Sequence, residues 1–519
     1  MIVARLARAC QTEIMVESAL RQLRVPRYRT VLEQKIRERR MTLEEFAEYA
    51  ETFARERGEP GTLSVRHLKR LMAGKGPNGR PLGPLRPATA RLLERIFEVS
   101  ADELLGKPGD QPAGGDRGRG DADDVERSCA EYSFGVTGIA DRQVRRSRVG
   151  RSRIADALAE YYRADDELYE VRSAGSVVRT SICTRADWLE LLCPIPAGVQ
   201  LQLAHDAGEL EPSDAEAAAE RLAEAKALYV RLVDAPLYRL LDVEVNRGSV
   251  SGVVGLTSFM NYALSADLLE AELADLVAGD GPIKRGSLPL RDRHLPDLRA
   301  VHELSTRLCA GGVLALCAIA RPADPYRGPA DYALLVQERS DQVVNAARRL
   351  SVIPKGFHQP LVDASGETSI GATLLREMEE ELFGRGDVDG TAGPHRAAAP
   401  MHLSRLSGPM RWLTERPDRL RMECTGFGFN LVSGNYEFAS LIVIEDEEFW
   451  TRYGGQVEAN WETGGMRIYS SRDQELITQL ISDESWCNEG LFAFLQGVRR
   501  LREIGGKRVD LPAVEVLGG

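Results

Sequence analysis

The sequence predicts a multidomain fold in three parts: an all-α head, a mixed α/β (α+β) middle domain and a second α/β domain. The chain has 519 residues, which is too long for one compact hydrophobic core. Residues 107–128 are rich in Gly, Pro and Asp and offer almost nothing to bury, which predicts a flexible linker. Helical patterns precede this linker, while helix and strand patterns alternate after it. We therefore expect domains at 27–106, 129–325 and 326–519.

The composition is that of an ordinary soluble globular protein, with 43% hydrophobic and 28% charged residues. No run approaches the roughly eighteen apolar residues of a membrane-spanning helix, and the N-terminus lacks the apolar core of a secretory signal. The eight cysteines form no C-x-x-C pair, and no histidine stands near them at zinc-ligand spacing. These features predict a cytoplasmic protein with buried or idle reduced thiols and no membrane partner.

Charge is unevenly spread along the chain. The formal net charge is −11, yet residues 21–95 hold 18 Lys/Arg and only 9 Asp/Glu. This segment therefore carries +9, and the remainder carries −20. A basic segment on an acidic body indicates that one domain meets a polyanion.

The head is predicted to consist of short helices. In "MTLEEFAEYAETFARERG", Thr42 and Glu45 have the spacing of a capping box at a helix start. The segment "LSVRHLKRLMAGKG" begins another helix, with Ser64 as its expected N-cap and Gly74 as its stop. Two helices joined at a turn can place the second one in the major groove of DNA.

Apolar and basic side chains separate on this second helix. Val65, Leu68 and Leu71 recur at i, i+3 and i+6 and should face inward, which turns the basic side chains outward. The segment from about residue 29 to 106 resembles the phage-repressor-like helix-turn-helix of Cro/XRE regulators, through "RRMTLEEFA", "VRHLKRLMAGK" and "ARLLERIFEVSADELLG". The resemblance implies double-stranded DNA as a partner and a homodimer on a two-fold site. The expected DNA contacts are Ser64, Arg66, His67, Lys69, Arg70 and Lys75. A small helical protein-interaction domain is the alternative.

The middle domain, residues 129–325, mixes helices and strands. "SRIADALAEYYRA" and "PSDAEAAAERLAEAKALYVRLVD" predict helices, and "SVVRTSICTR" and "VQLQLAH" predict strands. "YRLLDVEVNRGSVSGVVGLTSF" predicts a hairpin that turns at residues 246–248. The segment shows no catalytic constellation, so we expect it to couple the two ends of the chain or to form the dimer.

The C-terminal domain, residues 326–519, contains an acidic helix, "LLREMEEELFG", after the strands "DYALLVQERS" and "RLSVIPKGFHQPLV". On a helix, Glu377, Glu380 and Glu381 share one face. Three carboxylates on one face repel each other unless a cation lies among them, and hard oxygen ligands suit Mg²⁺ or Mn²⁺. The alternative is a solvated acidic face with no ligand.

The surrounding residues resemble the Nudix hydrolase signature. "GE" at 366–367 is followed by "REMEEELFG", in which Arg376, Glu377 and Met378 begin the family's R-E-apolar-x-E-E pattern. The resemblance implies an α/β/α sandwich with a mixed sheet, and substrates that are nucleoside diphosphates linked to another moiety. It implies metal binding by the three helix glutamates, and an arginine that orients Glu367. Glu462, beside Trp461, is the candidate general base on a later loop.

Together these features predict a DNA-binding transcriptional regulator whose Nudix-like domain senses a nucleotide-like or phosphorylated small molecule. One alternative is a Mg²⁺-dependent pyrophosphohydrolase with an N-terminal helical targeting module. Another is a non-catalytic interaction protein with an idle acidic helix. The expected catalytic residues for the enzyme are Glu367, Arg376 and Glu462.

Overall fold

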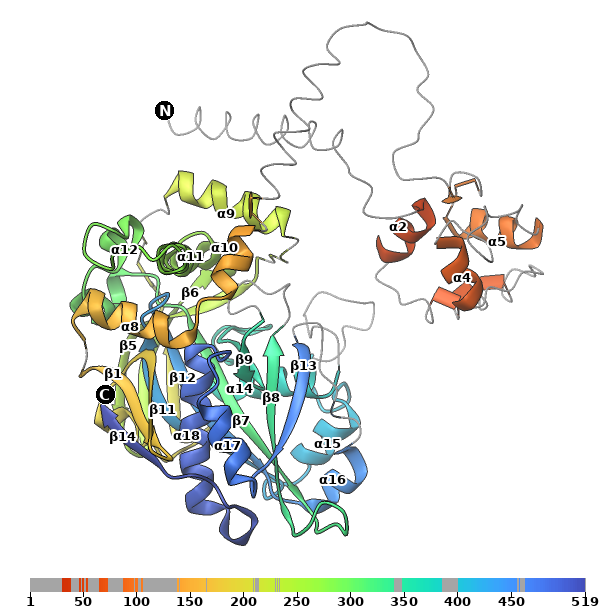
Figure 1. Ribbon diagram of the computed structural model, residues 1–519. Helices are drawn as coiled ribbons and strands as arrows, with labels where there is room; N and C mark the ends of the chain where they lie inside the picture. The colour runs from red at the N-terminus through yellow and green to blue at the C-terminus, as the bar shows by residue number, and fades with distance from the viewer. Residues whose placement is uncertain are drawn as a thin grey trace, which may run out of the picture. The chain divides into compact units, whose positions relative to one another are not determined.

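The computed structural model separates the chain into two compact units, residues 1–133 and residues 134–519 (Figure 1). No helix within the described residues is long and apolar enough to span a bilayer. The structure describes residues 30–38, 46–47, 49–50, 53–54, 65–72, 87–97, 99–100, 104–105, 138–139 and 141–518, the last range with gaps at 165, 209, 211–213, 229, 231, 233, 340–347, 385–399, 455–456 and 458–462.

The described part of the N-terminal unit is helical. It contains α2 (Val31–Glu38), α4 (Val65–Met72) and α5 (Pro87–Phe97). The stacked rings of Phe46 and Phe97, with centroids 5.4 Å apart, lie in its core. The same core buries the apolar residues Leu32, Ile36, Ala50, Ala54, Leu68, Leu71, Met72, Leu92, Leu93, Ile96 and Leu104. The expected linker, 107–128, lies outside the described residues.

A large mixed sheet organises the second unit. β7 and β12 run parallel, and the other paired strands along the sheet run antiparallel. Short strands β9 (Leu350–Val352), β10 (Lys355–Phe357) and β3 (Cys193–Pro194) pair with β8, β7 and β11. The main order among the described strands is β13 (Thr463–Ser470), β8 (Asp331–Arg339), β7 (Gly311–Arg321), β12 (Asn435–Ile444), β11 (Leu420–Asn430), β2 (Ser176–Cys183), β1 (Leu168–Ser173) and β14 (Val514–Gly518).

This sheet does not respect the boundary expected between residues 325 and 326. β1, β2 and β7 come from the stretch 129–325, yet they are strands of the same sheet as β8, β11 and β12. β7 lies between β8 and β12, and all its residues are buried. Since β7 supplies the middle of the sheet, the chain cannot divide after it, and residues 134–519 form one unit.

Helices cover both faces of the sheet (Figure 1). Along β12 the side chains alternate, so Phe438 and Ile442 join one core cluster while Leu441 and Val443 join the other. The first cluster includes residues of α14 (Ile370–Glu377), α15 (Gly408–Thr414) and α16 (Glu447–Tyr453). The second includes residues of α17 (Gln474–Ile481) and α18 (Asn488–Ile504).

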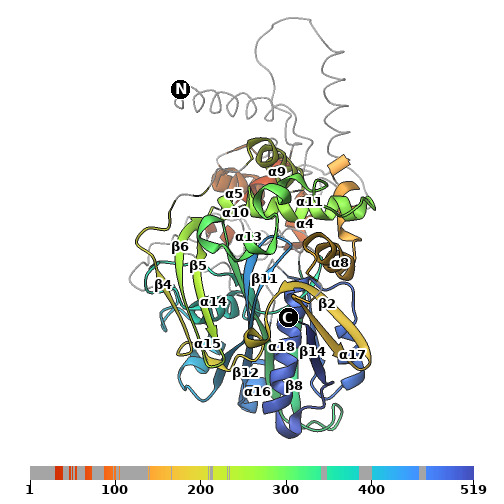
Figure 2. The same ribbon diagram turned by 90° about the vertical axis from the view of Figure 1, so that its left-hand side faces the viewer.

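A smaller sheet, order β4 (Val199–Leu203), β6 (Ser249–Ser258) and β5 (Pro236–Asn246), forms a separate edge of the unit (Figure 2). Asn246 pairs with Ser249, so the hairpin turns where the sequence predicted. The accompanying helices are α8 (Arg151–Tyr162), α9 (Ala215–Ala227), α10 (Phe259–Ala263), α11 (Ala266–Ala278), α12 (Pro289–His294) and α13 (Leu298–His302).

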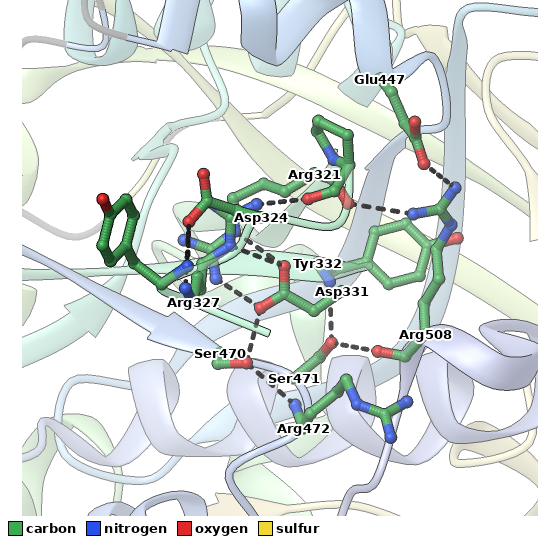
Figure 3. Close-up of polar contacts among 12 residues, drawn as sticks. Arg321, Asp324, Arg327, Asp331, Tyr332, Glu447, Ser470, Ser471, Arg472 and Arg508 are labelled. Carbon is green, nitrogen blue, oxygen red and sulfur yellow. Dashed lines mark hydrogen bonds and ion pairs between the residues drawn. The ribbon is translucent and has the colours of Figure 1, made fainter. Parts of the chain in front are cut away.

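A buried ion pair closes the β7–β8 hairpin (Figure 3). Arg321 and Asp331 face each other in the strand register, and Nε of Arg321 donates to Asp331 at 2.9 Å. Ser470 of β13 donates its hydroxyl to the same carboxylate at 2.6 Å. Nη1 of Arg508 donates to the backbone oxygen of Arg321 at 3.1 Å. The pair therefore joins three strands and the segment after α18.

We expect Asp331→Asn to destabilise residues 134–519 by about 3–5 kcal/mol, because it leaves a buried guanidinium without its counter-charge. The measurement is the urea unfolding midpoint of the full-length protein. Asp418→Asn is the matched control, since Asp418 pairs with Arg416 at the surface, and it should barely move the midpoint. Equal effects of the two substitutions would contradict this role of the buried pair.

Candidate functional site

The acidic helix is placed by an apolar stripe. Ile370, Leu374 and Met378 recur four residues apart and are fully buried against the sheet. The side chain of Ser369 caps the start of α14 by accepting from the amide of Gly371 at 3.2 Å. After Glu377 the helix widens into a π-helical turn over Met378–Leu382. The glutamates of interest therefore lie where the helix changes its winding.

Glu377 and Glu381 lie together against strand β10. Oε2 of Glu381 accepts from the amide of Lys355 at 2.7 Å. A Cβ atom at Gly356 would lie 2.2 Å from Oε1 of Glu377, so only glycine fits beside this carboxylate. Both glutamates are buried, while Glu380 is half-buried. The expected shared face thus brings two carboxylates to one strand of the sheet.

Arg376 binds its neighbour rather than Glu367. Nη2 of Arg376 donates to Glu377 at 2.7 Å, and Nη1 donates to the carbonyl of Gln359 at 3.1 Å. Glu367 instead accepts from the amide of Val362, 3.1 Å away within its own loop. No direct bond joins Arg376 to Glu367 within the described residues, although the charge of Glu367 still acts on the guanidinium and helps to raise the pKa of Arg376.

Glu379 has a different role from its neighbours. Its two carboxylate oxygens accept from the amide and the hydroxyl of Ser407, at 2.6 and 2.7 Å. Ser407 in turn caps α15 by accepting from the amide of Met410. Glu379 therefore fastens the π-helical turn after α14 to α15, which gives it a structural role that differs from the one expected of Glu377 and Glu381.

The oxygen donors at β10 fit a hard divalent cation such as Mg²⁺ or Mn²⁺. A carboxylate has about four lone-pair sites, so an oxygen that accepts from an amide can also ligate a metal. Among the described residues the ligand atoms of Glu377, Glu380 and Glu381 do not gather into one three-ligand group, so Glu377 and Glu381 alone would hold the ion at β10. The guanidinium of Arg376 competes for Glu377, which makes the site weaker than an unpaired carboxylate pair.

The loop between β10 and α14 is pinned by a neutral histidine. Nε2 of His358 lies 2.9 Å from the carbonyl of Thr368, which can only accept, so Nε2 carries the proton. Nδ1 then accepts from the hydroxyl of Tyr436 at 2.8 Å. Burial lowers the pKa of His358 to about 3. The fixed loop carries Glu367 at its far end.

A second charged cluster lies on the opposite face of the sheet, beneath α18. Nζ of Lys355 bonds Oε1 of Glu489 at 2.6 Å, and both side chains are buried. Burial acts to raise the pKa of Glu489. The ammonium group of Lys355 outweighs this effect, so the pKa of Glu489 is lowered. Asn430 donates to the other oxygen of Glu489 at 3.3 Å. The sequence did not predict this cluster. The one hint to it near Lys355 in the sequence is that a lysine follows an apolar strand.

Glu437 belongs to the same cluster but carries no matching cation of its own. It lies on β12, is 3% exposed, and no described residue bonds its Oε2 atom. Burial, and then the neighbouring Glu489, raise the pKa of Glu437 well above its usual value. Glu437 therefore keeps its proton to a higher pH than an ordinary glutamate does.

The expected DNA contacts are described in part. Lys69 and Arg70 are exposed on α4, and His67 is half-buried on the same helix. Arg66 lies within α4, but its side chain is outside the described residues, as are Ser64 and Lys75. The candidate base Glu462 is also outside them.

We expect the free energy of unfolding to fall less steeply with rising pH in Glu437→Gln than in wild type. The folded state holds a proton on Glu437 that the unfolded chain releases above the ordinary value of 4.5. Wild-type stability therefore falls as pH rises from that value through the raised pKa, by up to about 1.4 kcal/mol per pH unit. Glutamine cannot ionise, so the variant should gain on wild type as pH rises.

Urea unfolding of both proteins between about pH 4 and pH 8 measures this difference. The control is Glu448→Gln, on the exposed face of α16. Parallel stability curves for wild type and Glu437→Gln would show that Glu437 is ionised in the folded protein.

No family model matches the chain, and no curated protein matches it.

Proposed function

We propose that this chain is a DNA-binding transcriptional regulator whose unit 134–519 senses a nucleotide-like or phosphorylated small molecule. The observation that carries the proposal is that α4 has one buried apolar face and one exposed basic face. Leu68 and Leu71 are buried in a helical core, while Lys69 and Arg70 are exposed between them. This helix lies within the segment of net charge +9 in a chain of net charge −11.

The basic face of α4 suits the major groove. An arginine such as Arg70 can bond the O6 and N7 atoms of guanine through two donors, while Lys69 suits a phosphate. A homodimer would repeat these contacts on a two-fold site, with half-sites about one helical turn apart.

The acidic helix supports the sensing half of the proposal. Glu377 and Glu381 present oxygens at β10, beside a glycine that leaves room for them. Mg²⁺ or Mn²⁺ held there would polarise the phosphate oxygens of a ligand. A ligand that binds one arrangement of the protein better than another would shift the population that binds DNA.

Arg70→Ala should weaken specific DNA binding by about 1–3 kcal/mol, because it removes a base contact. Lys69→Ala should weaken binding to all duplexes and reduce the slope of affinity against salt by about one. Fluorescence anisotropy with duplexes that wild type enriches from a random pool measures both effects. Arg91→Ala removes the same charge from an exposed position on α5 and should do less. Weak, salt-insensitive binding of wild type to every duplex would overturn the proposal.

Glu377→Gln should abolish saturable Mn²⁺ binding at α14, whereas Glu379→Gln should retain it. The two residues share one helix, but Glu379 is turned toward Ser407. Isothermal titration of Mn²⁺ into each full-length protein measures the difference. Equal loss in both variants, or no binding by wild type, would remove the metal from the proposal.

The second candidate is a Mg²⁺-dependent pyrophosphohydrolase, which would use the same carboxylate oxygens of Glu377 and Glu381 at β10. An enzyme should convert at least one nucleoside diphosphate derivative in a panel, and the double substitution Glu380→Gln and Glu381→Gln should stop it. If the protein binds such a compound but does not hydrolyse it, the sensor is the better supported of the two functions.

A further inference from the structure

Three potential metal ligands that are far apart in the sequence meet in the second unit. They are the carboxylate of Glu167, the thiol of Cys183 and the imidazole of His302. Their ligand atoms all lie within 4.8 Å of one another. The scattered spacing of the cysteines predicted idle thiols, and six of them are indeed free and buried within the described residues. Cys183 differs from the others through the two partners beside it.

Regular structure fixes all three positions. Cys183 ends β2 and pairs with Leu168 of β1, so Glu167 lies just beyond the paired ends of the two strands. The amide of Thr184 donates to the carbonyl of Glu167 at 3.0 Å, which holds this junction. His302 is the last residue of α13, whose first turn is capped by Asp297.

Aromatic rings hold the imidazole over the strand end. The ring of His302 lies 5.5 Å from that of Phe429 and 6.3 Å from that of Trp188, both edge to face. Phe429 is also the β11 residue that pairs with Cys183. Phe429 therefore contacts both residues, and it fixes the histidine next to the cysteine at the end of β2.

Packing contacts hold Cys183 and His302, but the polar atoms of the three side chains are not engaged elsewhere within the described part of the chain. None of them forms a hydrogen bond or an ion pair with another residue that the structure describes, which contrasts with the glutamates of α14. Cys183 is 1% exposed, while Glu167 and His302 are exposed. The thiol thus lies at the base of the cluster, and the other two donors border an open approach from solvent.

We propose that Glu167, Cys183 and His302 bind a zinc ion. Sulfur, nitrogen and oxygen donors in one set are characteristic of Zn²⁺, which binds Cys at about 2.3 Å and His or carboxylate at about 2.0–2.2 Å. Ligand atoms on one tetrahedral ion are about 3.3–3.8 Å apart, so shifts of about 1 Å would close the site. Water or an incoming ligand takes the fourth position, which is the arrangement of an open zinc site.

The local charges are compatible with this ion. The guanidinium groups of Arg185 and Arg307 lie close enough to His302 to act on its charge. The two guanidinium groups oppose a bare dication. Burial, followed by the charge of Glu167, raises the pKa of the Cys183 thiol to about 12, so the ion has to displace the thiol proton; the Cys183 thiolate and the Glu167 carboxylate then offset its charge.

The test uses full-length protein stripped of metal and titrated with Co²⁺, which reports thiolate ligation through a near-ultraviolet charge-transfer band. We expect a saturable band in wild type that Zn²⁺ displaces and that Cys183→Ser abolishes. Cys193→Ser changes a buried cysteine on β3 and should leave the band intact. Oxygen-only binding at the α14 glutamates gives no such band, so the two sites are distinguished.

His302→Gln provides a test at an exposed position, in case the buried substitution disturbs folding. It should weaken Co²⁺ binding by more than about 100-fold, since even residues behind the ligands of a zinc site are worth about 10–100-fold. His402→Gln, an exposed histidine elsewhere, is its control. A wild-type protein without the band, or a band that survives in both Cys183→Ser and His302→Gln, would overturn the proposal.

Discussion

The complete burial of β7 is the constraint on which the second unit depends. This strand is flanked by β8 and β12, and helices cover both of its faces. Every backbone donor and acceptor of such a strand must find a partner within the sheet, because water does not reach it. β10 meets part of this need by pairing with β7, and the same pairing places Lys355 and Gly356. The candidate site is therefore attached to a strand that is buried along its whole length.

Strand alternation explains why two charged clusters lie so close without merging. Neighbouring residues on a strand point to opposite faces, so Lys355 reaches Glu489 of α18 while Gly356 lies against Glu377 of α14. The amide of Lys355 still bonds Glu381, so this one residue contacts carboxylates on both sides of the sheet. A change in either cluster would be felt in the other through a single peptide unit.

Local patterns predicted local structure well and long-range pairing poorly. The hairpin at Asn246 and the helix α18 follow from turn chemistry and helical periodicity, and both are present. The position of β7 was missed because a strand buried on both faces has no alternation, and nothing nearby shows that β2 will pair with β11. The bond between Lys355 and Glu489 spans 134 residues, and no spacing rule reaches that far. The glutamates of α14 were found because their spacing is helical, whereas the partner of Arg376 was not, since it depends on the path of a loop.

The pairing of β1 with β14 has a consequence for how the protein is made. Arg172 and Glu515, which bond across these strands, are separated by 343 residues. During synthesis β1 and β2 leave the ribosome long before β14 exists, so β1 lacks its second strand partner while most of the unit is translated. An unpaired edge is a site where strands of other chains can add. Until β14 is made, β1 itself is the outer strand, so the sheet reaches its final edge only at the end of translation.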